Sequence, residues 1–471
     1  MEKYPLGTQR GDALYTPSAR ALYRGNPWIE ALPDSLSDEE LFQALRGKIP
    51  YDENERTLDY YQREACVQSL AHVFIPLGET GEIARKIDAA IREGYVSRNP
   101  LVSGWNREMG KLQECVQSRD ADFHHLSGNN ANACGFCLVG DSGMGKTSAV
   151  NHTLAIYPQV LYHGSYNGTS FPCAQIVWMR LECPQDASVK GLCSEFFMEF
   201  DRITGENTFH KFAASGRATT DQMIPQMAML AQRHGLGLLV IDEIQNLSAA
   251  KSGGAQRMLN FIVQLVNKIG LPVLLVGTPP AIGLLSADLM TIRRSTGQQG
   301  MTYLSPLERD TYDWKALVKG IWKYQWTAEK TPLSQELQDE LHALSHGNID
   351  AAIKLFMETQ RLAIRNGRMG NAEALTPELL RQAAAGDGFR LVLQRLALEE
   401  SRRNASTAKE TPRKKPAKSV EKEISAEVPS ERTVSPKQKK TQPAAGSGKT
   451  GARMLDLLKD SGQWVSPDDD F

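Results

Sequence analysis

Short apolar runs alternate with amphipathic segments through the middle of the chain. Five of the runs predict buried strands, because they are too short for helices and are flanked by glycine or proline. They cover residues 135–139, 176–181, 237–241, 273–276 and 301–304. Helical spacing fills the gaps between them, for example in residues 255–268. Strands that alternate with helices predict an α/β fold with a parallel five-stranded sheet, over residues 121–305.

The chain on either side of this α/β region has mainly helical spacing. Before it, residues 1–120 form a mostly helical N-terminal region that we expect to bind a partner, with helices in residues 41–45 and 82–93. Prolines bar a continuous helix through residues 24–33. The large apolar side chains of that stretch therefore either pack against the protein or bind a partner: Trp28, Ile29 and Leu32.

After the α/β region, residues 306–400 predict a helical domain, most clearly in residues 334–344 and 351–365. Residues 401–450 are rich in Lys, Pro, Ser, Thr and Glu, and this composition predicts disorder. Residues 451–471 contain an amphipathic patch with Trp464, which we interpret as a docking peptide at the end of a tether. The alternative is that these residues are an inert tail.

The charge is unevenly distributed along the chain. The whole protein has a formal net charge of -1, but Ser401 to Lys449 contains 13 Lys and Arg against 5 Asp and Glu, a net of +8. A basic segment of this kind either attracts a polyanion or keeps the tail solvated. The sequence leaves both explanations open.

Length and composition exclude several classes of protein. With 471 residues, 41% hydrophobic and 23% charged, the chain is typical of a globular protein with more than one domain. No apolar run approaches the roughly 18 residues that a membrane helix needs. The first residues lack the apolar segment of a signal peptide, and seven cysteines do not make a disulfide scaffold. We therefore expect a cytoplasmic protein with no membrane partner.

A phosphate-binding loop follows the first predicted strand. Its glycines let the backbone curl so that N–H groups point at phosphate oxygens, beside the positive end of a helix. Lys146 can reach the β- and γ-phosphates of ATP, and the Thr147 hydroxyl can hold Mg²⁺. The expected nucleotide-binding residues are Gly140, Asp141, Ser142, Gly143, Met144, Gly145, Lys146, Thr147 and Ser148.

A second motif ends the strand at residues 237–241. Asp242 stands where a nucleoside triphosphatase places a second Mg²⁺ contact, and Glu243 is placed to polarise a water for attack on the γ-phosphate. We expect the next strand, which ends at Thr278, to lie beside the strands that carry both motifs. The Thr278 hydroxyl then either senses the γ-phosphate and orients the water, or caps a helix.

Around these motifs the chain resembles AAA+ ATPases, and more narrowly the TnsC family of transposition regulators, relatives of TniB. The shared blocks include Asn26-Pro-Trp-Ile-Glu-Ala-Leu-Pro33, Gly94-Tyr-Val-Ser-Arg-Asn-Pro100 and Tyr157-Pro-Gln-Val-Leu-Tyr-His163. The resemblance is densest from Leu236 to Thr278, through Ile241-Asp-Glu-Ile-Gln-Asn-Leu247, and covers roughly residues 20–385. It implies that the helical domain is the lid of an AAA+ ATPase.

The resemblance also implies a function. TnsC-like proteins assemble on double-stranded DNA as rings or helical filaments with ATP at subunit interfaces, and we expect DNA contacts without base readout. They link a target selector of the TniQ or TnsD type to a transposase of the TnsA and TnsB type, and ATP hydrolysis controls disassembly. This would be a bacterial protein, associated with the nucleoid when on DNA. The alternatives are an ATP-binding scaffold with negligible turnover, and an AAA+ helper of DNA replication or defence.

Further residues acquire candidate roles from the resemblance. Arg293 or Arg294 would be an arginine finger delivered to a neighbouring subunit. The basic residues that face DNA follow the second strand in this family, so the candidates are Lys190, Lys211 and Arg217. One departure is Gly347-Asn-Ile-Asp350, which has an acid where many AAA+ lids have Gly-x-x-Arg. It implies slow intrinsic hydrolysis, stimulated by partners.

Overall fold

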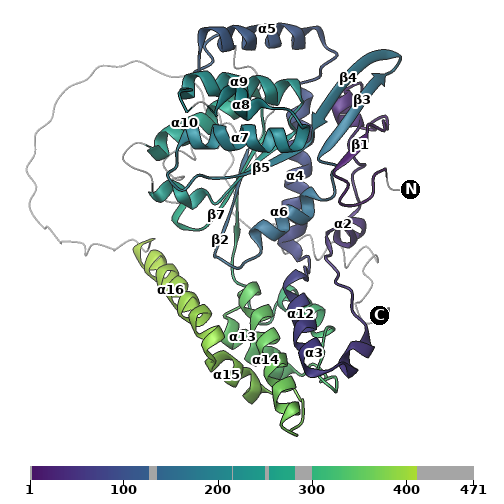
Figure 1. The fold of residues 1–471 in the computed structure, drawn as a ribbon, viewed down its shortest axis with the longest axis vertical. Helices are drawn as coiled ribbons and strands as arrows, with labels where there is room; N and C mark the ends of the chain where they lie inside the picture. The colour runs from purple at the N-terminus through teal and green to yellow at the C-terminus, as the bar shows by residue number, and fades with distance from the viewer. Residues whose placement is uncertain (1–2, 127–134, 215, 250–253, 282–299, 411–471) are drawn as a thin grey trace, which may run out of the picture. The chain divides into compact units, whose positions relative to one another are not determined.

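The computed structural model describes residues 3–126, 135–214, 216–249, 254–281 and 300–410 (Figure 1). Three hydrophobic cores organise these residues. Both candidate finger arginines, Arg293 and Arg294, lie outside the described residues, as does the predicted docking peptide, residues 451–471. In the described part of the chain, no helix is both long enough and apolar enough to cross a membrane.

The five predicted strands form one parallel sheet in the order β5-β6-β7-β2-β8. Their bounds are Phe136–Gly140 for β2, Trp178–Glu182 for β5, Leu238–Asp242 for β6, Val273–Gly277 for β7 and Met301–Leu304 for β8. Strand β7 pairs with both β2 and β6, so the strand before Thr278 lies between the strands of the two motifs, as expected.

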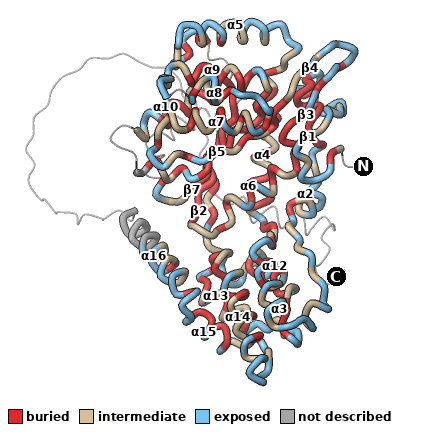
Figure 2. Tube along the Cα trace, viewed as in Figure 1, coloured by how far each residue is buried: buried red, intermediate tan, exposed pale blue. Residues whose placement is uncertain are grey.

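The three middle strands of this sheet, β6, β7 and β2, are buried along their whole length, which explains why they are nearly continuous apolar runs (Figure 2). In β6, Leu239 and Ile241 belong to one core while Leu238 and Val240 belong to the other. The helices that contribute to the first core are α5 (Ser103–Ser118), α7 (Val189–Thr204), α9 (Thr220–Arg233) and α10 (Gly254–Gln264), with short helices α8 (Thr208–Phe212), η4 (Ile244–Ala249) and η5 (Leu265–Ile269).

The second core joins the sheet to the N-terminal region. Its helices are η1 (Ala21–Tyr23), α1 (Pro27–Glu30), α2 (Asp38–Leu45), α4 (Gly78–Val96) and α6 (Lys146–Leu154). Helix α4 presents Ile83, Ile87, Ala90 and Ile91, all buried, along one face. The N-terminal region is therefore packed against the sheet and covers one of its faces.

A second sheet, of three strands, was not predicted from the sequence. It has the order β1-β3-β4, with β1 at Arg10–Asp12, β3 at Val160–Tyr166 and β4 at Thr169–Ile176. Strands β3 and β4 are antiparallel and joined by Asn167-Gly168, where both residues have positive φ. An Asn-Gly pair between β-rich segments is a strong hairpin signal, and it was overlooked because the strands carry polar side chains on their exposed faces.

The C-terminal helices form the third core. They are α12 (Tyr312–Trp322), α13 (Gln335–Ser345), α14 (Ile349–Arg368), α15 (Pro377–Ala385) and α16 (Asp387–Glu410). Helices α12 to α15 begin at side-chain caps that accept a backbone N–H three residues ahead: Thr311, Ser334, Asn348 and Thr376. We call these five helices the lid.

A segment from the N-terminal region completes the lid core. We call residues 49–77 the lid arm; it contains η2 (Glu53–Thr57), α3 (Tyr60–Val67) and η3 (Gln68–His72). Its side chains Val67, Leu70, Val73 and Leu77 are buried with lid residues, and α3 lies against α14 (Figure 1). A bidentate ion pair fastens the contact, because Arg63 donates to both carboxylate oxygens of Glu373 at 2.5 and 2.9 Å.

Helix α16 extends into the segment that the sequence predicted to be disordered. Its last residue is Glu410, so the first ten residues of the predicted linker, 401–410, are helical. Arg, Ala, Lys and Glu favour helix and no proline occurs before Pro412, which explains the extension. The remainder of the predicted linker lies outside the described residues.

The proline-interrupted stretch near residue 28 packs inside the protein. Trp28 is 1% exposed and its ring lies against Tyr95 and Trp105, with centroids 5.5 and 5.1 Å away. The Asn26 side chain accepts from the Trp28 N–H and donates to the Tyr95 carbonyl. Of the two interpretations of Trp28, Ile29 and Leu32, the structure supports packing, since each is no more than 2% exposed.

We predict that Trp28→Ala destabilises the fold by about 3–5 kcal/mol, the usual cost of removing a buried aromatic side chain. Urea denaturation followed by circular dichroism measures this change. The control is Tyr61→Ala, because Tyr61 belongs to the same N-terminal region but is 70% exposed. Loss of stability below about 1 kcal/mol in Trp28→Ala would contradict a structural role for this side chain.

Candidate nucleotide site

The phosphate-binding loop connects β2 to α6 as the sequence predicted. Strand β2 ends at Gly140 and helix α6 begins at Lys146. Gly143 and Gly145 have φ values of 84° and 77°, a left-handed conformation that strains any other residue. At Gly143 a side chain would also collide with the lid, since a Cβ atom would lie 2.7 Å from Asn348 Oδ1. Both glycines are therefore required by the backbone.

Lys146 is the buried cation of the loop. Its Nζ donates to the carbonyls of Gly140 and Asp141 at 2.8 and 2.9 Å. Burial lowers the pKa of this lysine, and the nearby carboxylates of Asp242 and Glu243 oppose the shift. The site thus concentrates positive charge at the N-terminus of a helix, where an anion is stabilised most.

Asp242 lies next to the loop at the end of β6. It is 3% exposed, and its Oδ2 accepts from the Thr147 hydroxyl at 2.9 Å. Arg180, from the neighbouring strand β5, donates to the same oxygen at 3.0 Å. The structure therefore brings together the hydroxyl and the carboxylate that were predicted to bind Mg²⁺, and it adds Arg180 as an ion-pair partner of Asp242.

Glu243 follows Asp242 in a constrained conformation. Its φ is 57°, which costs free energy for a residue with a side chain and is retained where surrounding structure enforces it. Its N–H donates to Asp242 Oδ1 at 2.8 Å. The Gln245 side chain donates to the Glu243 carboxylate and accepts from the Thr278 N–H at 3.1 Å. Gln245 thus connects the predicted water-polarising acid to the end of β7.

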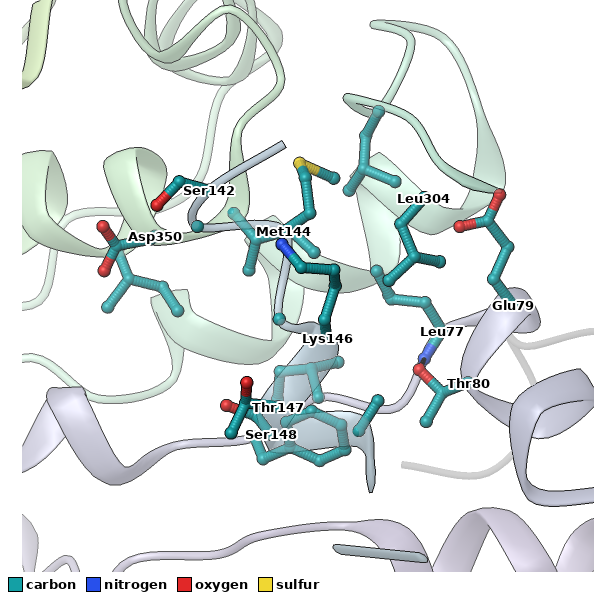
Figure 3. A pocket seen from close by; sticks show the side chains of 18 of the residues that line it. Leu77, Glu79, Thr80, Ser142, Met144, Lys146, Thr147, Ser148, Leu304 and Asp350 are labelled. Atoms are coloured by element: carbon teal, nitrogen blue, oxygen red, sulfur yellow. Dashed lines mark hydrogen bonds between the residues drawn. The ribbon is translucent and has the colours of Figure 1, made fainter. Parts of the chain in front are cut away.

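A cleft of about 520 Å³, within the range of ligand pockets, is lined by Lys146, Thr147, Asp242, Glu243, Gln245 and Thr278. Figure 3 shows Lys146 in the cleft, with Ser142 and Asp350 on one side and Leu77 and Thr80 on the other. Polar groups of the loop, β6 and β7 form one part of the lining. The other part is apolar and comes from the lid arm and the lid: Val73, Phe74, Leu77, Leu307, Leu317 and Ile353.

The lid docks directly on the phosphate-binding loop. Asn348 Nδ2 donates to the Ser142 carbonyl at 2.8 Å, and the Asp350 N–H donates to the Gly143 carbonyl at 3.0 Å. The Asp350 carboxylate, at the position where the resemblance led us to look for arginine, accepts from Lys354 at 2.8 Å. The lid motif therefore has a structural role in holding α14 against the loop.

The sequence analysis missed two contributors to the cleft, Gln245 and the lid arm, and also Arg180, which contacts Asp242. Arg180 belongs to no motif. A basic residue in a strand indicates an ion pair only when the neighbouring strand is known, which here is β6 with Asp242. Gln245 stands in a block that carried the resemblance, and its spacing from Glu243 was the available signal. The lid arm lines the apolar part of the cleft. It precedes the phosphate-binding loop by about seventy residues, and nothing in its own sequence indicates that it reaches the cleft.

The predicted DNA-binding residues lie outside this cleft. Lys190 is at the start of α7 and donates to the Gly216 carbonyl at 2.8 Å, which brings it next to Arg217. Lys211 is exposed on α8. The structure thus places two of the three candidates close together on exposed or half-exposed positions.

Comparison with known proteins supports the class of fold. A family model described as an AAA domain matches residues 132–285. No curated protein matches the sequence. Similar solved structures include the ORC1 protein of Aeropyrum pernix in complex with DNA, with 14% identity and a TM-score of 0.36, covering 59% of this chain and 64% of that one. This chain thus spans less than two thirds of that protein.

Two further solved structures are similar at the same level. A Walker-type ATPase of Pyrococcus abyssi has 18% identity and a TM-score of 0.37, covering 64% of this chain and 76% of that one. The Cdc6p structure from Pyrobaculum aerophilum has 14% identity and a TM-score of 0.37, covering 59% and 66%. The domain match, the sheet order and the phosphate-binding loop together define an AAA+ P-loop fold.

Proposed function

We propose that this protein binds and hydrolyses ATP with Mg²⁺ in the cleft between the phosphate-binding loop and the lid. The proposal rests on one observation: two motifs that are far apart in the sequence line the same cleft. They contribute Lys146, Thr147, Asp242 and Glu243. Loop N–H groups and Lys146 would hold the phosphates, and the apolar part of the lining suits a base.

The donor set also fits Mg²⁺. Across the described residues, no three His, Cys, Asp or Glu side chains are grouped to hold a metal by themselves. Thr147 and Asp242 supply two oxygens, and Mg²⁺ usually takes its remaining ligands from phosphates and water. When bound, Mg²⁺ would neutralise phosphate charge. Glu243 would accept a proton from the attacking water, and Gln245 would hold that carboxylate in position.

We further propose that ATP controls assembly of the protein on double-stranded DNA. The assembly would be a ring or helical filament that connects a TniQ- or TnsD-type target selector to a TnsA- and TnsB-type transposase. The resemblance of the blocks near residues 26–33 and 236–278 to TnsC supports this proposal. Lys190, Lys211 and Arg217 would contact the DNA backbone, while Arg293 or Arg294 would reach the ATP of a neighbouring subunit.

Sedimentation with duplex DNA of arbitrary sequence tests this proposal. We predict large DNA-dependent assemblies with a non-hydrolysable ATP analogue and none with ADP or without nucleotide. Because phosphate contacts dominate binding without base readout, assembly should weaken steeply between 50 and 200 mM salt and vary little with sequence. A monomer that ignores both DNA and nucleotide would overturn the transposition-regulator proposal.

A further inference from the structure

A small cavity lies at the end of strand β6 that is opposite the nucleotide cleft. Its volume is about 50 Å³, and it is lined by residues after α4, the first half of α5, the last turn of α9 and η5. Arg98 connects the cavity to the sheet, because its Nη1 donates at 2.8 Å to the carbonyl of Leu236, two residues before β6. Asp242 of the nucleotide cleft stands at the other end of the same strand. The cavity is therefore separate from the proposed ATP site.

Arg98 is a buried cation without a counterion. The residue is 2% exposed, and burial lowers its pKa to about 10. Among the residues that the structure describes, no carboxylate lies within ion-pair distance of its guanidinium. Charged side chains are rarely buried to this extent unless they are paired, because an isolated buried charge costs several kcal/mol. A ligand of opposite charge would supply the missing partner.

The guanidinium also has a donor without an acceptor. Its Nε donates to the Gly94 carbonyl at 2.8 Å, but Nη2 is buried and has no hydrogen-bond partner. Gln232 lines the same cavity and has the complementary defect, since its Nε2 donates to the Ile269 carbonyl while its buried Oε1 accepts nothing. Buried polar atoms without partners are uncommon and costly. Two of them on side chains that line one cavity indicate a site for a polar ligand.

The rest of the lining favours an anion. Helix α5 begins at Ser103 with no side-chain cap and no acid in its first turn, and Gly104 of that turn lines the cavity. The uncapped N–H groups and the positive end of the helix dipole stabilise negative charge. Lys268 of η5 adds a second positive side chain to the lining. The acid in the described lining is Glu108, whose carboxylate accepts from Lys111 at 2.9 Å.

The size and the walls of the cavity restrict the anion. A volume of about 50 Å³ has room for a few water-sized groups, which is enough for a carboxylate and too little for a nucleotide. Apolar side chains complete the walls and suit methylene groups: Trp105, Met109, Leu112, Leu126 and Ile269. We propose that this cavity binds a carboxylate on a short aliphatic stem, with Arg98 as its ion-pair partner. Two sources present this group: a free small carboxylic acid, and an Asp or Glu side chain of a partner protein.

Ligand-observed NMR with the full-length protein tests the proposal, with propionate and its neutral analogue propionamide as probes. We expect propionate to bind at least about tenfold more tightly than propionamide, because only propionate forms a hydrogen bond between two charged groups with Arg98. Arg98→Met should abolish this preference. Lys268→Met, which changes a half-buried residue, should weaken propionate binding about two- to fivefold, as for the loss of a partly exposed ion pair.

Lys111→Met is the matched control, because it makes the same change on α5 at a residue that does not line the cavity. It should bind propionate normally. N-acetylglutamate N-methylamide distinguishes the two sources: binding as tight as that of propionate indicates a partner's acidic side chain, and exclusion while propionate binds indicates a free acid. Lys268→Met keeps the test decisive if Arg98→Met does not fold. Equal binding of propionate and propionamide, binding of neither, or unaltered propionate binding in Lys268→Met would overturn the proposal and leave a cavity that holds only water.

Discussion

Replacing Lys146 with alanine is expected to weaken ATP binding by roughly 100-fold or more and to abolish nucleotide-dependent assembly on DNA. Each hydrogen bond to a charged group contributes about 1.5–3 kcal/mol, and a tenfold change in affinity corresponds to about 1.4 kcal/mol. Lys146 already donates two hydrogen bonds within the loop, to Gly140 and Asp141, and phosphate oxygens would replace those acceptors. Titration with a fluorescent ATP analogue measures the loss.

The free protein should remain folded in this variant. The lysine is buried and its pKa is lowered by that burial, so removing its charge also removes a desolvation penalty. Lys319→Ala, at an exposed position of α12, is the control and should bind ATP normally. Unaltered nucleotide affinity in Lys146→Ala would mean that the cleft does not bind phosphates through this loop.

Glu243→Gln is expected to reduce ATP hydrolysis roughly 100- to 10,000-fold, the usual contribution of a general base, while ATP affinity stays within a few-fold. Glutamine keeps the shape and the hydrogen bond to Gln245 but accepts no proton from water. If hydrolysis drives disassembly, DNA-bound assemblies of this variant should persist in ATP as they do with a non-hydrolysable analogue. Single-turnover hydrolysis and the lifetime of the assemblies are the two measurements.

Glu182→Gln provides the comparison for this variant. Glu182 ends the neighbouring strand β5 in register with Asp242, is exposed, and does not line the cleft. It should hydrolyse ATP at the normal rate. Equal lifetimes of DNA-bound assemblies formed by Glu243→Gln and by the unaltered protein in ATP would favour a scaffold that binds ATP without using its hydrolysis.

The elements that the sequence predicted well are those with a strong local signal. Strands β2, β6 and β7 are almost wholly apolar and buried, and β5 and β8 are short runs with only a few polar residues, so all five were placed within two residues of their observed bounds. The loop at Gly140 to Thr147 depends on residue types at fixed spacing, and its strand and helix context was confirmed. Asp242 and Glu243 were located by their place at the end of a buried strand.

What the sequence did not reveal depends on contacts between distant segments. Arg180 becomes meaningful only because β5 lies beside β6, and strand order is not encoded locally. Arg395 of α16 also lines the cleft, but arginines are common on amphipathic helices, so the sequence did not single it out. Trp28 had two open interpretations because burial depends on α4 and α5, which the local pattern does not specify.

The lid arm has a consequence for how the chain is made. Its apolar residues Val67, Leu70, Val73 and Leu77 emerge early from the ribosome, but their packing partners begin at Trp314. At 5–20 residues per second, synthesis of residues 78–313 takes roughly 10–50 s, during which these side chains lack their native neighbours. The lid core therefore forms only when synthesis is nearly complete, and nascent chains expose an apolar segment that a chaperone can hold.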